Sequence, residues 1–211
     1  MTKNTTPPIT RGFLTSGLPV LRSLGVAGCL LACGCSLPEA KSDTARYYVL
    51  PAVEAVASNS PGLHIGLFPV QLPEYLKLRS MAVRDGASEI YYRDGERWAE
   101  PLDAGLARVL RQQLSATAQV LPYPFHPDET RDYDVRVRVQ ACEGTADGQV
   151  VFSATFEIYA AGANGALVAQ HVFTAEPAKW DGSDYARLAE LLGADATKLA
   201  DAITAALPQK N

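Results

Sequence analysis

The chain has 211 residues, of which 47% are apolar and 20% are charged, a composition typical of a folded globular protein and not of a disordered one. It carries 19 basic and 23 acidic residues, which gives a formal charge of −4 at pH 7. An acidic chain repels phosphate backbones, so this charge argues against nucleic acid as a partner.

The beginning of the chain is typical of a bacterial secretion leader. Its three charged residues, Lys3, Arg11 and Arg22, are all basic, and an apolar segment follows at 23–32. This segment is too short to span a bilayer, which requires about 20 apolar residues. We therefore expect residues 1–34 to be a signal peptide.

Small residues stand directly before a cysteine at the end of this leader, and this arrangement resembles a bacterial lipobox. Cys35 follows Ala32-Cys33-Gly34 and is the expected site of lipid attachment, whereas Cys33 is the alternative. Neither cysteine is followed by aspartate, the usual signal for retention at the inner membrane. We therefore expect a lipid anchor in the outer membrane, with the protein facing the periplasm.

Behind the anchor we expect a tether at residues 35–45 and a single domain at 46–211. Removal of the leader leaves 16 basic and 23 acidic residues, a formal charge of −7. Such a domain is repelled by anionic headgroups, so the lipid has to supply the membrane attachment. Cys142 is the only cysteine of this domain and is expected to be buried without a disulfide partner.

The first part of the domain contains short apolar segments separated by turn signals. Asp85-Gly86 and Asp94-Gly95 are typical of turns. A helix is expected after Pro101, because apolar residues recur there at helical spacing. The expected strands are residues 46–50, 63–70, 81–84 and 89–92. The apolar stripe of the helix consists of Leu102, Leu106, Val109, Leu110 and Leu114.

The second part of the domain alternates apolar and polar residues. This pattern predicts an antiparallel meander with one solvated face, over residues 133–141, 150–158 and 167–174. A second amphipathic helix is expected at 184–207, bent near Gly193. The predicted fold class is α+β, a two-layer domain with a mostly antiparallel sheet and two amphipathic helices on one face.

No catalytic or metal-binding pattern is found in the sequence. His64, His126 and His171 are far apart, and no spacing typical of a metal site or a catalytic triad is present. We therefore expect a protein that is not an enzyme and has no cofactor or metal. Arg136 and Arg138 lie on one strand face, where they form either a solvated surface or a small anion site.

Two stretches indicate either packing or an interface. Trp98 follows Arg97 before the first helix, where the tryptophan either packs on the first helical turn or anchors a partner. Leu72, Tyr75 and Leu76 lie in a Pro-containing turn and are the second candidate for contact with a partner or with acyl chains.

These stretches carry a resemblance to a known family. The lipobox, the segment from Ile65 to Val70, the motif Leu72-Pro-Glu-Tyr-Leu76 and the motif Arg97-Trp-Ala-Glu-Pro-Leu102 occur in the order seen in the PqiC family of ABC-type transport auxiliary lipoproteins. The resemblance covers most of the chain behind the leader. It implies no catalytic residues.

The resemblance implies a part in lipid transport across the cell envelope. In such systems an MCE-domain protein anchored in the inner membrane forms a hydrophobic tunnel through the periplasm. The lipoprotein is expected to dock or receive the far end of this tunnel, to self-associate and to support membrane integrity, with phospholipid as the cargo. The alternative is a stand-alone periplasmic lipid-binding or outer-membrane assembly lipoprotein, which predicts a sizeable apolar cavity between helices and sheet.

The lipidation site is directly testable. We expect mass spectrometry of the mature N-terminal peptide to find the lipid on Cys35, because the small residues of the lipobox precede it. A peptide that begins with lipidated Cys33 would instead establish the alternative cleavage site.

Overall fold

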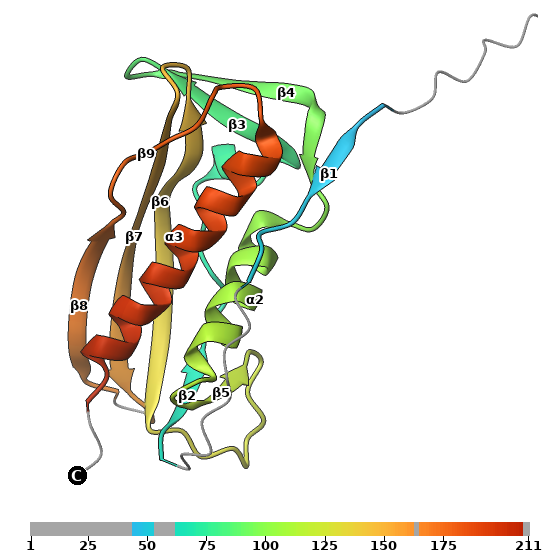
Figure 1. Ribbon diagram of the computed structural model, residues 1–211. Coiled ribbons are helices and arrows are strands. Elements are labelled where there is room, and N and C mark those ends of the chain that lie inside the picture. The colour runs from blue at the N-terminus through green and yellow to red at the C-terminus, as the bar shows by residue number, and fades with distance from the viewer. Residues whose placement is uncertain (1–43, 53–61, 163–164, 209–211) are drawn as a thin grey trace, which may run out of the picture. The chain divides into compact units, whose positions relative to one another are not determined.

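The structure is a computed structural model that describes residues 44–52, 62–162 and 165–208 (Figure 1). The expected signal peptide, both candidate lipidation sites and nearly all of the tether lie outside these residues. By its internal contacts, Asp43–Asn211 forms one compact unit. The expected end of the signal peptide at residue 34 and the expected end of the tether at residue 45 stay predictions.

The predicted two-layer α+β fold is confirmed. A nine-stranded sheet forms one layer, and helices α2 (Leu102–Leu114) and α3 (Tyr185–Ala206) cover one of its faces (Figure 1). Neither of these helices in the described part of the chain is long and apolar enough to cross a membrane.

The predicted meander forms the centre of the sheet. Strand β6 (Tyr133–Thr145) is antiparallel to β7 (Gln149–Ala160), which in turn pairs with β8 (Leu167–Thr174) and β9 (Ala178–Lys179). The alternating sequence of β6 places its valines in the core and its arginines on the solvated face. The alternation of apolar and polar residues thus correctly predicted which of these side chains face the core and which face solvent.

The other half of the sheet contains parallel pairs, so the sheet is mixed. On the side opposite β7, strand β6 pairs in parallel with β2 (His64–Leu67) near its start and with β3 (Ser80–Asp85) near its end. Strand β5 (Gln119–Pro122) pairs in parallel with β2. The longest pairs remain antiparallel, as expected.

The expected turn at Asp94-Gly95 is wrong. Strand β4 (Glu89–Trp98) runs through this dipeptide, and its pairing with β3 jumps from Arg93 to Arg97 across a bulge. A bulge inserts extra residues without ending the strand, so a turn-like dipeptide can lie inside it. The result is a strand of 10 residues where the sequence predicted four.

The bulge gives Glu96 a structural role. Glu96 is buried and pairs with strand β1 (Arg46–Tyr48), where Tyr48 donates a hydrogen bond to its Oε2 over 2.6 Å and Arg46 forms an ion pair with it. Burial and this hydrogen bond raise the pKa of Tyr48 to about 12. The phenol therefore stays protonated and continues to donate at any physiological pH.

Both helices begin and end close to their predicted bounds. The five residues of the expected stripe on α2 are all buried. Helix α3 begins after Asp184, whose side chain accepts a hydrogen bond from the backbone N–H of Arg187. It continues through Gly193, where a Cβ would lie 2.7 Å from the carbonyl oxygen of Pro51. The glycine therefore allows close approach of the chain that follows β1.

The space between helices and sheet is filled with side chains. The largest of them expose less than 2% of their surface, including Phe152, Phe156, Leu106, Leu188 and Leu192. Exposure this low leaves no water-sized space beside these side chains. The apolar cavity that a lipid carrier would need is therefore not found around these described residues.

One buried carboxylate is held inside the sheet. Glu143 is 1% exposed, and its Oε1 accepts hydrogen bonds from Nε and Nη2 of Arg84 over 2.8 and 2.6 Å. Its Oε2 accepts from the Tyr75 hydroxyl and from the backbone N–H of Cys142. Cys142 is buried and free, as expected, and burial raises the pKa of its thiol.

Replacement of this carboxylate should destabilise the fold. We expect Glu143→Ala to lower the free energy of unfolding by about 3 kcal/mol, because Arg84 and Tyr75 would lose their buried partner. Urea unfolding followed by circular dichroism measures this loss. Glu190→Ala, which removes a surface ion pair with Arg187, is the control and should cost at most about 0.5 kcal/mol. Equal losses for the two variants would contradict a special role of Glu143.

Candidate partner-binding groove

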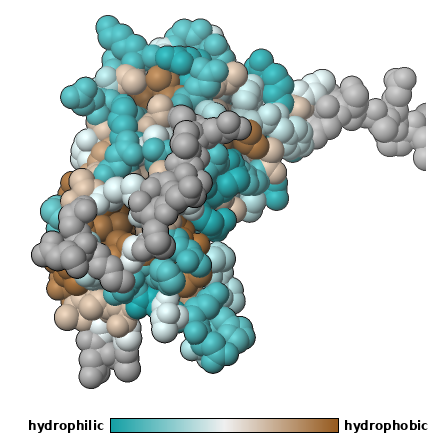
Figure 2. Space-filling view, turned by 60° about the horizontal axis from the view of Figure 1, so that its bottom comes forward, coloured by the Kyte–Doolittle hydropathy of each residue, from teal (hydrophilic) through white to brown (hydrophobic). Residues whose placement is uncertain are grey.

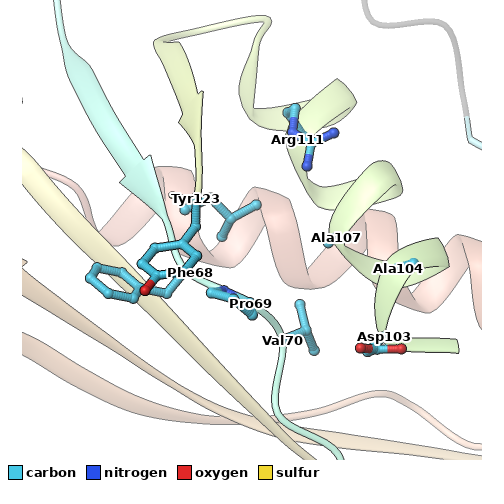
Figure 3. Close-up of a pocket in the computed structure, with 9 residues that line it drawn as sticks. Phe68, Pro69, Val70, Asp103, Ala104, Ala107, Arg111 and Tyr123 are labelled. Carbon is cyan, nitrogen blue, oxygen red and sulfur yellow. The ribbon is translucent and has the colours of Figure 1, made fainter. Parts of the chain in front are cut away.

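A groove runs between α2 and the chain that continues from β2. Its first pocket has a volume of about 180 Å³, and Figure 3 shows the side chains around it. The lining residues are Leu67, Phe68, Pro69, Val70, Asp103, Ala104, Ala107, Arg111 and Tyr123.

Backbone hydrogen bonds to β6 hold one wall of this groove. The N–H of Phe68 donates to the carbonyl of Val135 over 3.0 Å, and the N–H of Gln71 donates to that of Val137 over 2.9 Å. Pro69 lies between these two donors and has no N–H of its own to satisfy. The wall is therefore attached to β6, although its residues lie beyond the end of β2.

The opposite wall is the exposed side of α2. Ala104 and Ala107 are small, so they leave room for another molecule to approach the helix. Arg111 lies one turn further along the same wall (Figure 3), and its Nε is buried without a hydrogen-bond partner among the described residues. Because this Nε has almost no accessible surface, a bound partner cannot reach it, and the missing hydrogen bond is a cost to the domain itself.

Three aromatic rings extend the groove at the end where β2 and β5 lie. Phe68 lies 5.5 Å from Tyr123 and 5.0 Å from Phe125, measured between ring centroids. Tyr123 is 54% exposed, which is high for an aromatic residue. The guanidinium of Arg131 lies 4.0 Å from the centroid of Phe125. Aromatic and arginine side chains are enriched at protein interfaces.

A glycine allows this aromatic group to pack on β2. A Cβ on Gly66 would lie 2.7 Å from the side chain of Arg131 and 2.8 Å from that of Phe125. Any larger residue would therefore push these two side chains away from the strand. Arg131 is further fixed by an ion pair of 2.8 Å with Asp134.

A second pocket continues the groove along α2. It has a volume of about 480 Å³ and shares Val70 and Asp103 with the first, so the two form one continuous groove. Its other lining residues are Gln71, Leu72 and Lys77. Seen from the end that holds β2 and β5, hydrophobic residues reach the surface in patches between hydrophilic ones (Figure 2).

The sequence-predicted interface residues are only partly exposed. Leu72 borders the second pocket but is largely buried, and Leu76 is 3% exposed in the core. Tyr75 is half-buried, and its hydroxyl is bound to Glu143. A direct interface role for Leu72 and Leu76 would require them to become exposed, and it stays a prediction.

Trp98 and Arg97 lie at the end of β4. Trp98 is 4% exposed and belongs to the core, which agrees with the packing interpretation of this residue. Its backbone N–H donates to the carbonyl of Arg79 over 2.7 Å. Arg97 is half-buried, and its Nε donates to the carbonyl of Asp94 over 3.0 Å. Both side chains thus contribute to the local structure around the bulge.

The groove itself was missed by sequence reasoning. Tyr123 and Phe125, two aromatic residues in the Pro-containing segment from Pro122 to Pro127, are the sequence signal that could have indicated it. The described residues also contain no group of three or more His, Cys, Asp or Glu side chains that would hold a metal ion.

The model of the family described as "ABC-type transport auxiliary lipoprotein component" matches residues 48–204. The chain belongs to this family. The predicted resemblance to the PqiC family is therefore confirmed, and the chain is an auxiliary lipoprotein of a transport system. No curated protein matches the chain.

Two solved structures share the fold of this auxiliary lipoprotein. One, described as an uncharacterized protein, is 22% identical, has a TM-score of 0.62 and aligns over 75% of this chain and 95% of its own. The other, XCC0632 from Xanthomonas campestris, of the DUF330 family, is 14% identical with a TM-score of 0.62, over 75% and 92% of the two chains.

The burial of Trp98 predicts its effect on stability. We expect Trp98→Ala to lower the free energy of unfolding by about 3–5 kcal/mol, because it leaves a large cavity in the core. Arg97→Ala is the neighbouring control and should cost much less. Thermal unfolding of the purified lipoprotein measures both. An unchanged melting temperature for Trp98→Ala, together with loss of partner binding, would instead establish the interface role.

Proposed function

We propose that the protein is an outer-membrane-anchored periplasmic lipoprotein in an MCE-type intermembrane phospholipid transport system. In this proposal it is not an enzyme: it docks or receives the end of the MCE tunnel and thereby supports membrane integrity. The family match over residues 48–204 carries the proposal, because it assigns the chain to auxiliary components of transporters.

The groove along α2 supports docking of a protein partner. Its walls combine apolar residues with the exposed ring of Tyr123, which together offer contact area to a partner. The filled layer between helices and sheet argues against the stand-alone lipid carrier. The lipid would therefore travel through the partner, and not inside this domain.

The expected tether limits where docking takes place. About ten residues reach at most roughly 35 Å when fully extended. The domain would then bind its partner close to the inner leaflet of the outer membrane, where a tunnel that crosses the periplasm has to end.

Self-association is supported by the exposed edge of the sheet. Within the described residues, β8 pairs only with β7, and it carries no charged residue or proline. Its Leu167, Val168 and Val172 are among the most exposed large apolar residues of the structure. An uncharged, apolar edge strand is suited to pair with another chain, so we propose that copies of the lipoprotein associate through it.

Capture of the MCE partner tests the docking proposal. We expect the full-length lipoprotein to co-purify with the MCE-domain protein of its transport system, and Ala104→Arg to reduce this capture at least about ten-fold by filling the groove. Ala205→Arg places the same side chain on an exposed position of α3 and should leave capture unchanged. A wild-type protein that never captures the MCE protein would overturn the proposed function.

A further inference from the structure

A small polar pocket lies on the solvated face of the sheet, the face opposite the helices. It has a volume of about 90 Å³, between the arginines of β6 and the polar residues of β7. Its lining residues are Gln71, Arg136, Val137, Arg138, Thr155 and Glu157. This volume is comparable with a phosphate-sized group and is far too small for an acyl chain.

Arg136 is held in place by two aromatic rings. Its guanidinium carbon lies 4.9 Å from the centroid of Phe68 and 4.7 Å from that of Tyr159. Such contacts occupy the faces of the guanidinium and leave its N–H donors free in the plane. No carboxylate forms an ion pair with Arg136 in the described part of the chain, so these donors are available to an external acceptor.

Arg138 supplies a second cation on the same face. Residues two apart on a strand point to the same side and are separated by about 7 Å. The Nε of Arg138 donates to Oε1 of Gln71 over 3.1 Å, and this bond orients the side chain over the pocket. The two guanidinium groups therefore flank one small volume, an arrangement that suits the several oxygens of a phosphate.

Glu157 adds a negative charge to the same pocket. It lies opposite Arg136 in the register of β6 and β7. Its Oε2 accepts a hydrogen bond from the Tyr159 hydroxyl over 3.1 Å, and its Oε1 accepts from Nε2 of Gln170 over 3.5 Å. Both of these hydrogen-bond partners are neutral side chains. A simple anion would be repelled by the carboxylate of Glu157, whereas a ligand with an ammonium group near its phosphate would be attracted.

We propose that this pocket binds the headgroup of a zwitterionic phospholipid, with the phosphodiester on Arg136 and Arg138 and the ammonium on Glu157. Phosphoethanolamine has this chemistry, with an ammonium two carbons from the phosphate oxygen. The acyl chains remain outside the pocket. The inference rests on the proposed function, since it names the lipid class that would reach the docked tunnel.

The direction in which ligand affinity changes when each charge is removed distinguishes this site from a general phosphate site. Removal of Arg136 weakens every phosphate ligand. Removal of the charge on Glu157 weakens only the ligand with an ammonium group, and it strengthens ligands that are purely anionic. Opposite responses to one substitution do not arise from loss of folding.

Calorimetric titration of the full-length lipoprotein in a maltoside detergent tests the proposal. The probes are glycerophosphoethanolamine, glycerophosphoglycerol and inorganic phosphate. We expect saturable binding of glycerophosphoethanolamine, weakened about ten-fold in Arg136→Gln by the loss of charge-assisted hydrogen bonds. Glu157→Gln should weaken this probe and strengthen the other two. Arg138→Gln is a second variant, and we expect it to weaken glycerophosphoethanolamine binding as Arg136→Gln does.

Arg187→Gln is the matched control, because it removes an exposed arginine from α3, on the helix side of the sheet. It should leave all three affinities unchanged. Absence of saturable glycerophosphoethanolamine binding, or equal effects of Arg136→Gln and Arg187→Gln, would overturn the site. A uniform response of all three probes to Glu157→Gln would overturn the zwitterionic headgroup. The titration uses no MCE protein, so its failure is separate from failure of docking.

Discussion

Strand β6 pairs with β7 along nearly its whole length, and on its other side it pairs with β2 near its start and with β3 near its end. One strand thus joins both halves of the sheet. Near its start it fixes the wall of the groove through Phe68 and Gln71, and near its end it carries Glu143 into contact with Arg84. One wall of the groove and the arginines of the polar pocket are thus attached to β6, so the register of this strand determines where both lie.

The alternating sequence of β6 also places its core side chains and its arginines on opposite faces of the sheet. Val135, Val137 and Val139 point toward the helices and are almost completely buried. Arg136 and Arg138 point the other way and reach solvent between Phe68 and the residues of β7. A shift of one residue in the pairing would exchange these two sets, so the buried layer that stabilises the fold also fixes the position of the arginines.

The three surfaces lie on different parts of the domain and do not compete for one ligand. The groove follows α2, and the polar pocket lies on the solvated face of the sheet. Strand β8 forms an edge of the sheet (Figure 1). Phe68 belongs to both the groove and the stacking contact of Arg136. It therefore connects the groove proposed for a partner with the pocket proposed for a headgroup. The three proposed roles, docking, self-association and headgroup binding, therefore use separate surfaces and would be compatible with one another.

The sequence by itself determined the features that depend on local pattern. The apolar stripe from Leu102 to Leu114 was sufficient to place α2, and strict alternation placed β6 and β7, because helical and extended backbones orient side chains with fixed periods. The family also followed from the order of the motifs along the chain.

The tertiary structure decided the features that depend on contacts between distant segments. The parallel pairs of β6 join segments that are distant in sequence, and no local pattern encodes them. The bulge at Asp94-Gly95 resembles a turn until β1 and β3 are in place beside it. Likewise, the aromatic end of the groove exists only once Phe68, Tyr123 and Phe125 come together, and Arg136 gains its support only between Phe68 and Tyr159. Such contacts between distant segments leave no periodic trace in the sequence.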